Sequence, residues 1–222
     1  MKVKICGLTN LEDALTAVHA GADYLGFIFY PPSKRGITPE TAGEIAAHLR
    51  TLTPCPLLVG VFVDETADHM AHILDTCHLD LAQLSGSEPP SLVGDPHSPI
   101  YGRAYKALRP TSLAEAEADV EWYLPPLLRH DSQPSLLLDT YHPILLGGTG
   151  QTGNWAVSAH LAPQIPRLML AGGLTPANIA TAIHQVQPYA VDVASGVEAT
   201  PGKKDPDLIR TFIYNAKQSG NR

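Results

Sequence analysis

Two residues at the ends of apolar runs, far apart in the chain, carry groups that can transfer protons. Cys6 follows Val3-Lys4-Ile5, and Asp139 follows Leu136-Leu137-Leu138. A thiol near positive charge can act as a nucleophile or a base, whereas a lone cysteine without such charge is a small buried hydrophobic residue. Partial desolvation favours a neutral carboxyl group, the form that a general acid needs, whereas a solvated aspartate caps or anchors a loop. Cys6 is therefore a candidate base or nucleophile, and Asp139 a candidate general acid.

Three glycine-bearing turns follow three late apolar runs. They contain Gly148-Thr149-Gly150, Gly172-Gly173 and Ser195-Gly196. Glycine lets backbone N–H groups approach an anion closely, although one isolated glycine pair would indicate only a turn. Three successive turns of this kind predict a phosphate site.

Other polar side chains are expected near strand ends, where a small substrate can reach them. Gln83 closes one apolar run, Lys106 flanks the end of the next, and Arg35 lies in an earlier loop. Arg35 suits a carboxylate or a phosphate, with a solvated charge cluster as the alternative. Asp64 and Asp192 occupy positions comparable to that of Asp139, and Asp64 fits a helix cap equally well.

The chain shows no spacing typical of metal or disulfide sites. Its ten histidines lack an HExxH pattern. The three cysteines, Cys6, Cys55 and Cys77, are an odd number without metal-ligand spacing. We therefore expect reduced thiols and no metal.

Eight apolar runs alternate with segments of helical periodicity, which predicts parallel strand pairing. The expected strands are Val3–Cys6, Tyr24–Phe29, Leu57–Val63, Leu79–Leu84, Ile100–Leu108, Leu136–Asp139, Leu168–Ala171 and Ala190–Val193. The expected helices lie near residues 10–20, 39–52, 66–76, 111–121, 155–161, 176–186 and 205–217, with Asn10, Thr38-Pro39 and Thr175-Pro176 as possible caps.

Strands that are apolar on both faces are typical of a doubly wound sheet or a (β/α)₈ barrel, and eight units favour the barrel. We expect one domain over residues 1–222. The prolines between Ser85 and Pro99 leave room for only a short or irregular fourth helix, and the proline-broken 120–134 region lengthens a connection. In such a barrel the residues just past the C-terminal strand ends gather at one mouth.

Composition excludes several classes of protein. The 222 residues are 44% hydrophobic and carry a net charge of −7, so we expect no nucleic-acid or anionic-membrane partner. The charged start of the chain does not fit a signal peptide, and no apolar stretch is long enough to span a membrane. We therefore expect a cytoplasmic protein.

The chain resembles the phosphoribosylanthranilate isomerase family of tryptophan biosynthesis in motifs spread from residue 3 to about 213. These are 3–9, 21–27, 32–35, 59–63, 137–140, 147–150, 170–174, 192–198 and 201–205. The resemblance implies a (β/α)₈ barrel that converts N-(5-phosphoribosyl)anthranilate to 1-(2-carboxyphenylamino)-1-deoxyribulose 5-phosphate, without cofactor or metal. It implies Cys6 as general base, Asp139 as general acid and Arg35 near the anthranilate and the reacting sugar, with the glycine turns as the phosphate cradle.

One motif departs from the family. Where the family usually has Gln-Leu-His-Gly-Asp-Glu, this chain has Gln83-Leu84-Ser85-Gly86-Ser87-Glu88. A non-catalytic or altered-specificity phosphate-binding barrel is therefore the alternative function. An indole-glycerol-phosphate synthase would need a catalytic lysine, for which Lys106 is one candidate, together with paired glutamates. A sugar-phosphate epimerase would need metal ligands. Both monomer and homodimer fit the sequence.

Overall fold

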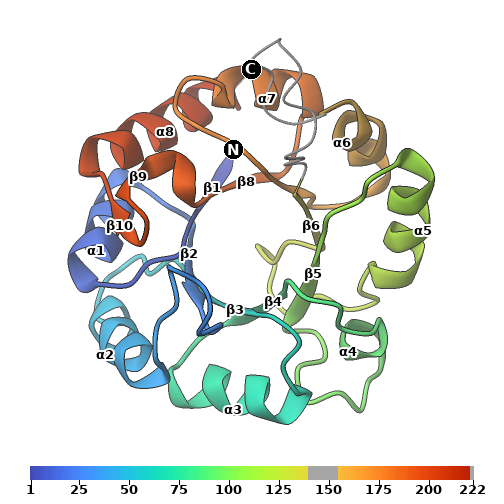
Figure 1. The fold of residues 1–222 in the computed structure, drawn as a ribbon, viewed down its shortest axis with the longest axis horizontal. Helices are drawn as coiled ribbons and strands as arrows, with labels where there is room; N and C mark the ends of the chain where they lie inside the picture. The colour runs from blue at the N-terminus through green and yellow to red at the C-terminus, as the bar shows by residue number, and fades with distance from the viewer. Residues whose placement is uncertain (140–154, 221–222) are drawn as a thin grey trace.

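Eight parallel strands close into a barrel in the computed structural model, which describes residues 1–139 and 155–220. Each strand pairs with the next in sequence, and β8 pairs with β1 to complete the ring. Figure 1 shows the helices as an outer ring around these strands. The strands are β1 (Lys2–Cys6), β2 (Tyr24–Ile28), β3 (Leu57–Phe62), β4 (Leu81–Leu84), β5 (Ala104–Leu108), β6 (Leu136–Asp139), β7 (Met169–Ala171) and β8 (Ala190–Val193).

The helices alternate with the strands, so the expected (β/α)₈ barrel is confirmed. They are α1 (Leu11–Ala20), α2 (Pro39–Leu49), α3 (Ala67–Thr76), α4 (Ser91–Gly94), α5 (Leu113–Tyr123), α6 (Trp155–Leu161), α7 (Ile179–Val186) and α8 (Pro206–Ser219). Two 3₁₀ turns, η1 (Ala162–Gln164) and η2 (Ser195–Val197), and a hairpin of β9 (Glu198–Thr200) and β10 (Lys203–Lys204) complete the described elements.

Side-chain caps fix the starts of several helices. The side chains of Asn10 and Thr38 accept from backbone N–H groups of α1 and α2, as expected from the sequence. The short fourth helix is also confirmed, because α4 is a single turn. The start of the seventh helix was predicted wrongly: α7 begins at Ile179, three residues after Pro176. The Asn178 side chain accepts from the Thr175 N–H and donates to the Gly173 carbonyl, which holds 173–178 as a loop.

The expected fifth strand was too long at its start. Residues 98–103 form hydrogen-bonded turns, with Tyr101 N–H donating to Ser98 and Arg103 N–H to Ile100. Gly102 has a positive φ of 74°, a conformation that a strand residue does not adopt. The apolar character of Ile100 reflects burial in a turn.

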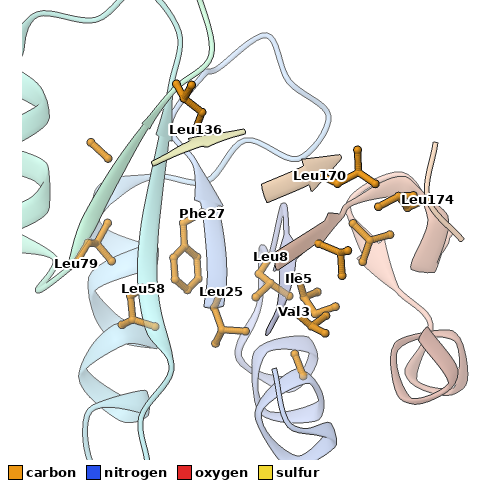
Figure 2. Close-up of a cluster of buried hydrophobic side chains, with 14 of the residues drawn as sticks. Val3, Ile5, Leu8, Leu25, Phe27, Leu58, Leu79, Leu136, Leu170 and Leu174 are labelled. Carbon is orange, nitrogen blue, oxygen red and sulfur yellow. The ribbon is translucent and has the colours of Figure 1, made fainter. Parts of the chain in front are cut away.

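Two concentric cores hold the barrel together, because successive side chains of a strand point to opposite faces. The outer core, part of which Figure 2 shows, lies between strands and helices and contains Val3, Ile5 and Phe27. The inner core fills the barrel and contains Tyr24, Leu81, Tyr105, Leu137 and Ala190, among others. The alternation decides which polar residues face the interior.

Carboxylates close the N-terminal end of the barrel. Asp23, just before β2, accepts from the Val3 N–H of β1 at 2.9 Å and pairs with Lys217 at 3.2 Å. Asp80, just before β4, accepts in the same way from the Leu58 N–H of β3 at 2.7 Å. This end therefore serves stability, as is usual in such barrels.

We expect Asp23→Asn to lower the free energy of unfolding by about 1–2 kcal/mol, because it weakens a charged hydrogen bond to a strand N–H and removes the ion pair with Lys217. Urea denaturation measures the change. The matched control is Glu117→Gln, which removes a carboxylate from an exposed contact with His160 and should change stability by less than about 0.5 kcal/mol. Equal stabilities of the two variants would contradict this account of the N-terminal end.

Candidate active site

Cys6 and Asp139 lie at the C-terminal ends of β1 and β6 and belong to the inner face of the barrel. Val3 and Ile5 pack in the outer core, so the alternating positions of β1, Lys4 and Cys6, face inward. Leu137 packs in the inner core, so Asp139, two residues later, shares its face. The closed parallel barrel therefore brings the thiol and the carboxyl group to one mouth.

Asp192 of β8 links the two groups electrostatically. It is buried beside Lys4, with 3.1 Å between Lys4 Nζ and Asp192 Oδ1. Burial raises the pKa of the Asp192 carboxyl, Lys4 opposes that rise, and the negative charge of Asp139 adds to it. The charge of Asp192 also acts on the Cys6 thiol. The Asp139 carboxylate contacts Arg109 Nε at 3.3 Å.

Cys6 is buried, with only 4% of the residue exposed. Burial raises its pKa, Lys4 and Lys204 lower it, and Asp192 raises it, so that the net pKa lies above the ordinary value. In the free protein the sulfur is therefore held as a thiol, with positive charges placed to stabilise the thiolate.

Arg35 lies beside Cys6 and is held by a carboxylate. A Cβ on Gly7 would lie 2.8 Å from Arg35 Cδ, so the arginine side chain runs over the residue that follows Cys6. Arg35 donates from Nε and Nη2 to the two oxygens of Glu198, at 2.7 and 2.8 Å. Lys204 Nζ donates to the same carboxylate at 2.9 Å. Glu198 therefore joins the loops that follow β2 and β8.

The predicted glycine turns after β7 and β8 pack on each other. Gly172 and Gly173 both have positive φ, 96° and 63°, which favours glycine at each position. A Cβ on Gly196 would overlap the carbonyl oxygen of Leu174, so no larger residue fits there without moving one of the turns. Ser195 opens the 3₁₀ turn η2. The third predicted turn, Gly148-Thr149-Gly150, lies outside the described residues.

Gln83 and Lys106 lie on different faces of their strands. Gln83 follows the inner-core residue Leu81 by two positions and lies in the barrel floor, where its Oε1 accepts from Lys4 Nζ at 2.8 Å and from the Tyr105 hydroxyl at 3.0 Å. Lys106 follows the inner-core residue Tyr105 directly and points outward. The structure therefore does not bring Lys106 together with the other candidate residues.

The Lys106 ammonium has a structural partner on the outer side of β5. It pairs with the buried Glu88 carboxylate at 2.6 Å and lies over the Tyr123 ring of α5. Glu88 also accepts from the backbone N–H groups of Asp64 and Gly86, which ties together the loops after β3 and β4. The alternative prediction that Asp64 caps a helix is wrong, because the N-terminal cap of α3 is Thr66.

Sequence reasoning missed three charged residues of the site, namely Lys4, Glu198 and the Lys204 that shares the Glu198 carboxylate. Lys4 stands in an apolar strand at an alternating position with Cys6, which was a readable signal for an inward lysine. Glu198 ends the glycine-bearing Ser195–Glu198 segment, but its pairing with Arg35 joins loops 163 residues apart in sequence. No local pattern indicates such a partner.

Within residues 1–139 and 155–220, no three His, Cys, Asp or Glu side chains gather as a metal-binding group. Among the helices of those residues, none has the length and apolar character needed to cross a bilayer.

Comparison with known proteins gives one consistent result. The family model of N-(5'-phosphoribosyl)anthranilate (PRA) isomerase matches residues 3–215. The N-(5'-phosphoribosyl)anthranilate isomerases of Trichlorobacter lovleyi and Geobacter sulfurreducens are 45% and 43% identical, the first over 99% of both chains and the second over 98% of both.

Solved structures agree with the sequence matches. The phosphoribosyl anthranilate isomerase of Thermotoga maritima is 42% identical, with a TM-score of 0.83 over 98% of this chain and 99% of its own. Another isomerase structure, in complex with reduced 1-(o-carboxyphenylamino)-1-deoxyribulose 5-phosphate, is 38% identical, with a TM-score of 0.78 over the same shares. With its barrel, its paired catalytic candidates and these full-length matches, the chain belongs to the N-(5'-phosphoribosyl)anthranilate isomerase family.

Proposed function

We propose that this chain converts N-(5-phosphoribosyl)anthranilate to 1-(2-carboxyphenylamino)-1-deoxyribulose 5-phosphate in tryptophan biosynthesis, with Asp139 as general acid and Cys6 as general base. The observation that carries the proposal is the placement of both groups on the inner face at one end of the barrel. An Amadori rearrangement needs this combination, because one group must donate a proton and another must accept one.

Asp139 acts first, on the closed sugar. Its carboxyl proton passes to the furanose ring oxygen, the bond from that oxygen to C1′ breaks, and the lone pair of the arylamine nitrogen forms an iminium with C1′. A carboxyl group at the end of the apolar strand β6 is suited to this step because it is partly shielded from water, with its side chain 26% exposed.

Cys6 acts second, on the open chain. The iminium acidifies the C2′ hydrogen. Cys6 first releases its thiol proton to solvent, and the resulting thiolate accepts the C2′ proton, which leaves an enolamine that tautomerises to the ketone. The electron pair remains within the substrate, so the step needs no external electron acceptor. The positive charges of Lys4, Arg35 and Lys204 all act on the sulfur, which supports its role as a thiolate.

Arg35 and the glycine turns bind the two charged ends of the substrate in this proposal. Arg35 offers a guanidinium beside Cys6 for the anthranilate carboxylate, and Glu198 holds it there. Gly172, Gly173, Ser195 and Gly196 form the described part of the phosphate cradle, at the loops that bind phosphate in many barrels of this type. Gln83 and Lys106 stay predicted substrate contacts, and the outward position of Lys106 gives its prediction no support.

The complex of a related isomerase with a reduced carboxyphenylamino-deoxyribulose phosphate supports this substrate class. The Thermotoga maritima isomerase is described as dimeric. For this chain, both monomer and homodimer are compatible with the proposed active site, which lies within one barrel.

We expect Cys6→Ser and Asp139→Asn each to lower kcat by about 10²–10⁴-fold, because each removes one proton-transfer group. Loss of the fluorescence of phosphoribosylanthranilate measures the rate, and binding of the reduced product analogue should persist in both variants. The matched control is Cys55→Ser, which removes a thiol outside the site and should keep the rate. Unchanged rates in Cys6→Ser and Asp139→Asn would refute the roles, and an inactive unsubstituted protein that still binds the analogue would favour the non-catalytic alternative.

We expect Arg35→Lys to lower kcat/KM by about 10- to 100-fold, mainly through a higher KM, because lysine cannot keep the two-point contact with Glu198 and still offer a planar donor to the substrate. Steady-state kinetics give the split between kcat and KM. Arg50→Lys is the control: Arg50 pairs with Asp80 at the opposite end of the barrel, so its kinetics should match those of the unsubstituted protein. Similar kinetics for both variants would argue against Arg35 as a substrate contact.

We expect Gly196→Ala to weaken binding of the reduced product analogue by about 10-fold or more, since the new Cβ displaces the turn at Leu174 and widens the phosphate cradle. Titration calorimetry measures the dissociation constant. Gly94→Ala is the matched control, because a Cβ there meets open space. If Gly196→Ala binds as tightly as Gly94→Ala, these two turns do not form the cradle.

A further inference from the structure

We propose that Lys4 is a positioning residue for the isomerisation: its ammonium, buried below Cys6 and fixed by Asp192 and Gln83, supplies the positive charge that allows the sulfur to act as a thiolate base. This inference rests on the proposed role of Cys6.

The geometry places Lys4 directly under the thiol. Both residues face inward from β1, two positions apart. A Cβ on Gly26 would lie 2.8 Å from Cys6 Sγ and 3.1 Å from Lys4 Cε, so the two side chains fill the same space beside β2. The absence of a side chain at Gly26 is therefore what allows the lysine stem and the sulfur to lie together.

Two fixed acceptors hold the ammonium. Lys4 Nζ donates to Gln83 Oε1 at 2.8 Å and to Asp192 Oδ1 at 3.1 Å, from β4 and β8 on either side. An ammonium has three protons, so these two bonds leave one for a further acceptor. The Lys4 side chain is 0% exposed, so water does not screen its charge.

The surrounding charges single out Lys4. The charged and titratable groups that face Cys6 are Lys4 and Asp192 in the floor, Tyr105 of β5, and Arg35 and Lys204 above. Among the charges that act on the thiol, that of Lys4 has the largest effect, ahead of Asp192 and Lys204.

The three cations near the thiol differ in the carboxylate that holds them and in the element that carries them. Arg35 and Lys204 share one carboxylate, that of Glu198, in the loops. Lys4 lies in the strand itself. Burial alone would lower the pKa of Lys4. Asp192 and the other neighbours together raise the pKa by more than burial lowers it, so the net pKa lies above the ordinary value and the ammonium stays charged.

A buried lysine is a poor way to stabilise a barrel interior. An apolar side chain of similar volume packs there without the desolvation of a charge. Apart from its two acceptors, Gln83 and Asp192, the ammonium lies in a barrel whose inner core consists of apolar side chains and tyrosines. The desolvation free energy of burying the Lys4 ammonium is explained if its charge stabilises the Cys6 thiolate.

The test is a titration of the Cys6 thiolate up to about pH 11, read from ultraviolet thiolate absorbance as the difference from a Cys6→Ser counterpart. We expect the thiolate absorbance of Lys4→Met to fall to about one tenth or less of that of the unsubstituted protein at the same pH, because the variant lacks the cation that lowers the thiol pKa. At neutral pH the isomerisation rate of Lys4→Met should fall by about 10-fold or more, in step with the thiolate fraction. Lys4→Arg keeps the charge and should keep the pKa within about one unit of the starting value.

Lys2→Met is the control, because Lys2 lies two residues earlier on the same strand and pairs with Asp23 at the opposite end. Coincident titrations of Lys4→Met and Lys2→Met would overturn the inference. If Lys4→Met does not fold, Lys4→Gln decides instead, because it keeps a polar side chain beside Gln83 and Asp192 but carries no charge, and a thiol titration that coincides with that of Lys2→Met overturns the inference. A Cys6→Ser variant that keeps the full rate would instead remove the proposed function, which is a distinguishable result.

Discussion

The site depends on the pairing of the first strand with the last. In the β1–β8 register Lys4 stands opposite Asp192, and their side chains form an ion pair inside the barrel at 3.1 Å. Parallel strands that close a ring must share one direction, so the C-terminal ends of β1, β6 and β8 open at the same mouth. Cys6 and Asp139 therefore lie at the same mouth although they are 133 residues apart in sequence, and the charge balance around the thiol exists only once the ring is closed.

A second layer of contacts orders the loops above this floor. Glu198 holds Arg35 and Lys204, and Lys204 in turn donates to the Ala194 carbonyl at 2.9 Å. The Glu198 pKa is raised by burial but lowered more by these two cations, so the carboxylate stays ionised. Floor and loops thus place several cations around one thiol, each held by a carboxylate that limits its movement.

The sequence predicted the barrel and most of its elements because periodicity is a local signal. Apolar runs that alternate with capped helices indicate β/α units, and eight units close a barrel. The same alternation assigns Lys4 to the interior, because its neighbours Val3 and Ile5 face outward. It assigns Lys106 to the outer side once Tyr105 is known to face the interior. Without that knowledge, strand-end position alone suggested that Lys106 reaches the mouth. The turn before β5 and the Asn178 loop before α7 are held by local backbone and side-chain hydrogen bonds, which apolar periodicity does not report. The Arg35–Glu198 pair joins loops 163 residues apart, which no window of sequence contains.

The buried Glu88 carboxylate affects which mutations the loops after β3 and β4 can tolerate. It holds the main chain of Gly86 and Asp64, so this backbone does not depend on the Ser87 side chain. The Ser85 hydroxyl, in contrast, accepts from Gln83 Nε2 at 3.1 Å, and Gln83 in turn holds Lys4. Residue 87 can therefore be exchanged while the backbone frame stays intact, whereas an exchange at residue 85 also removes a contact of the barrel floor. Here the buried carboxylate carries the scaffold, so mutation can change a side chain of this loop without refolding it.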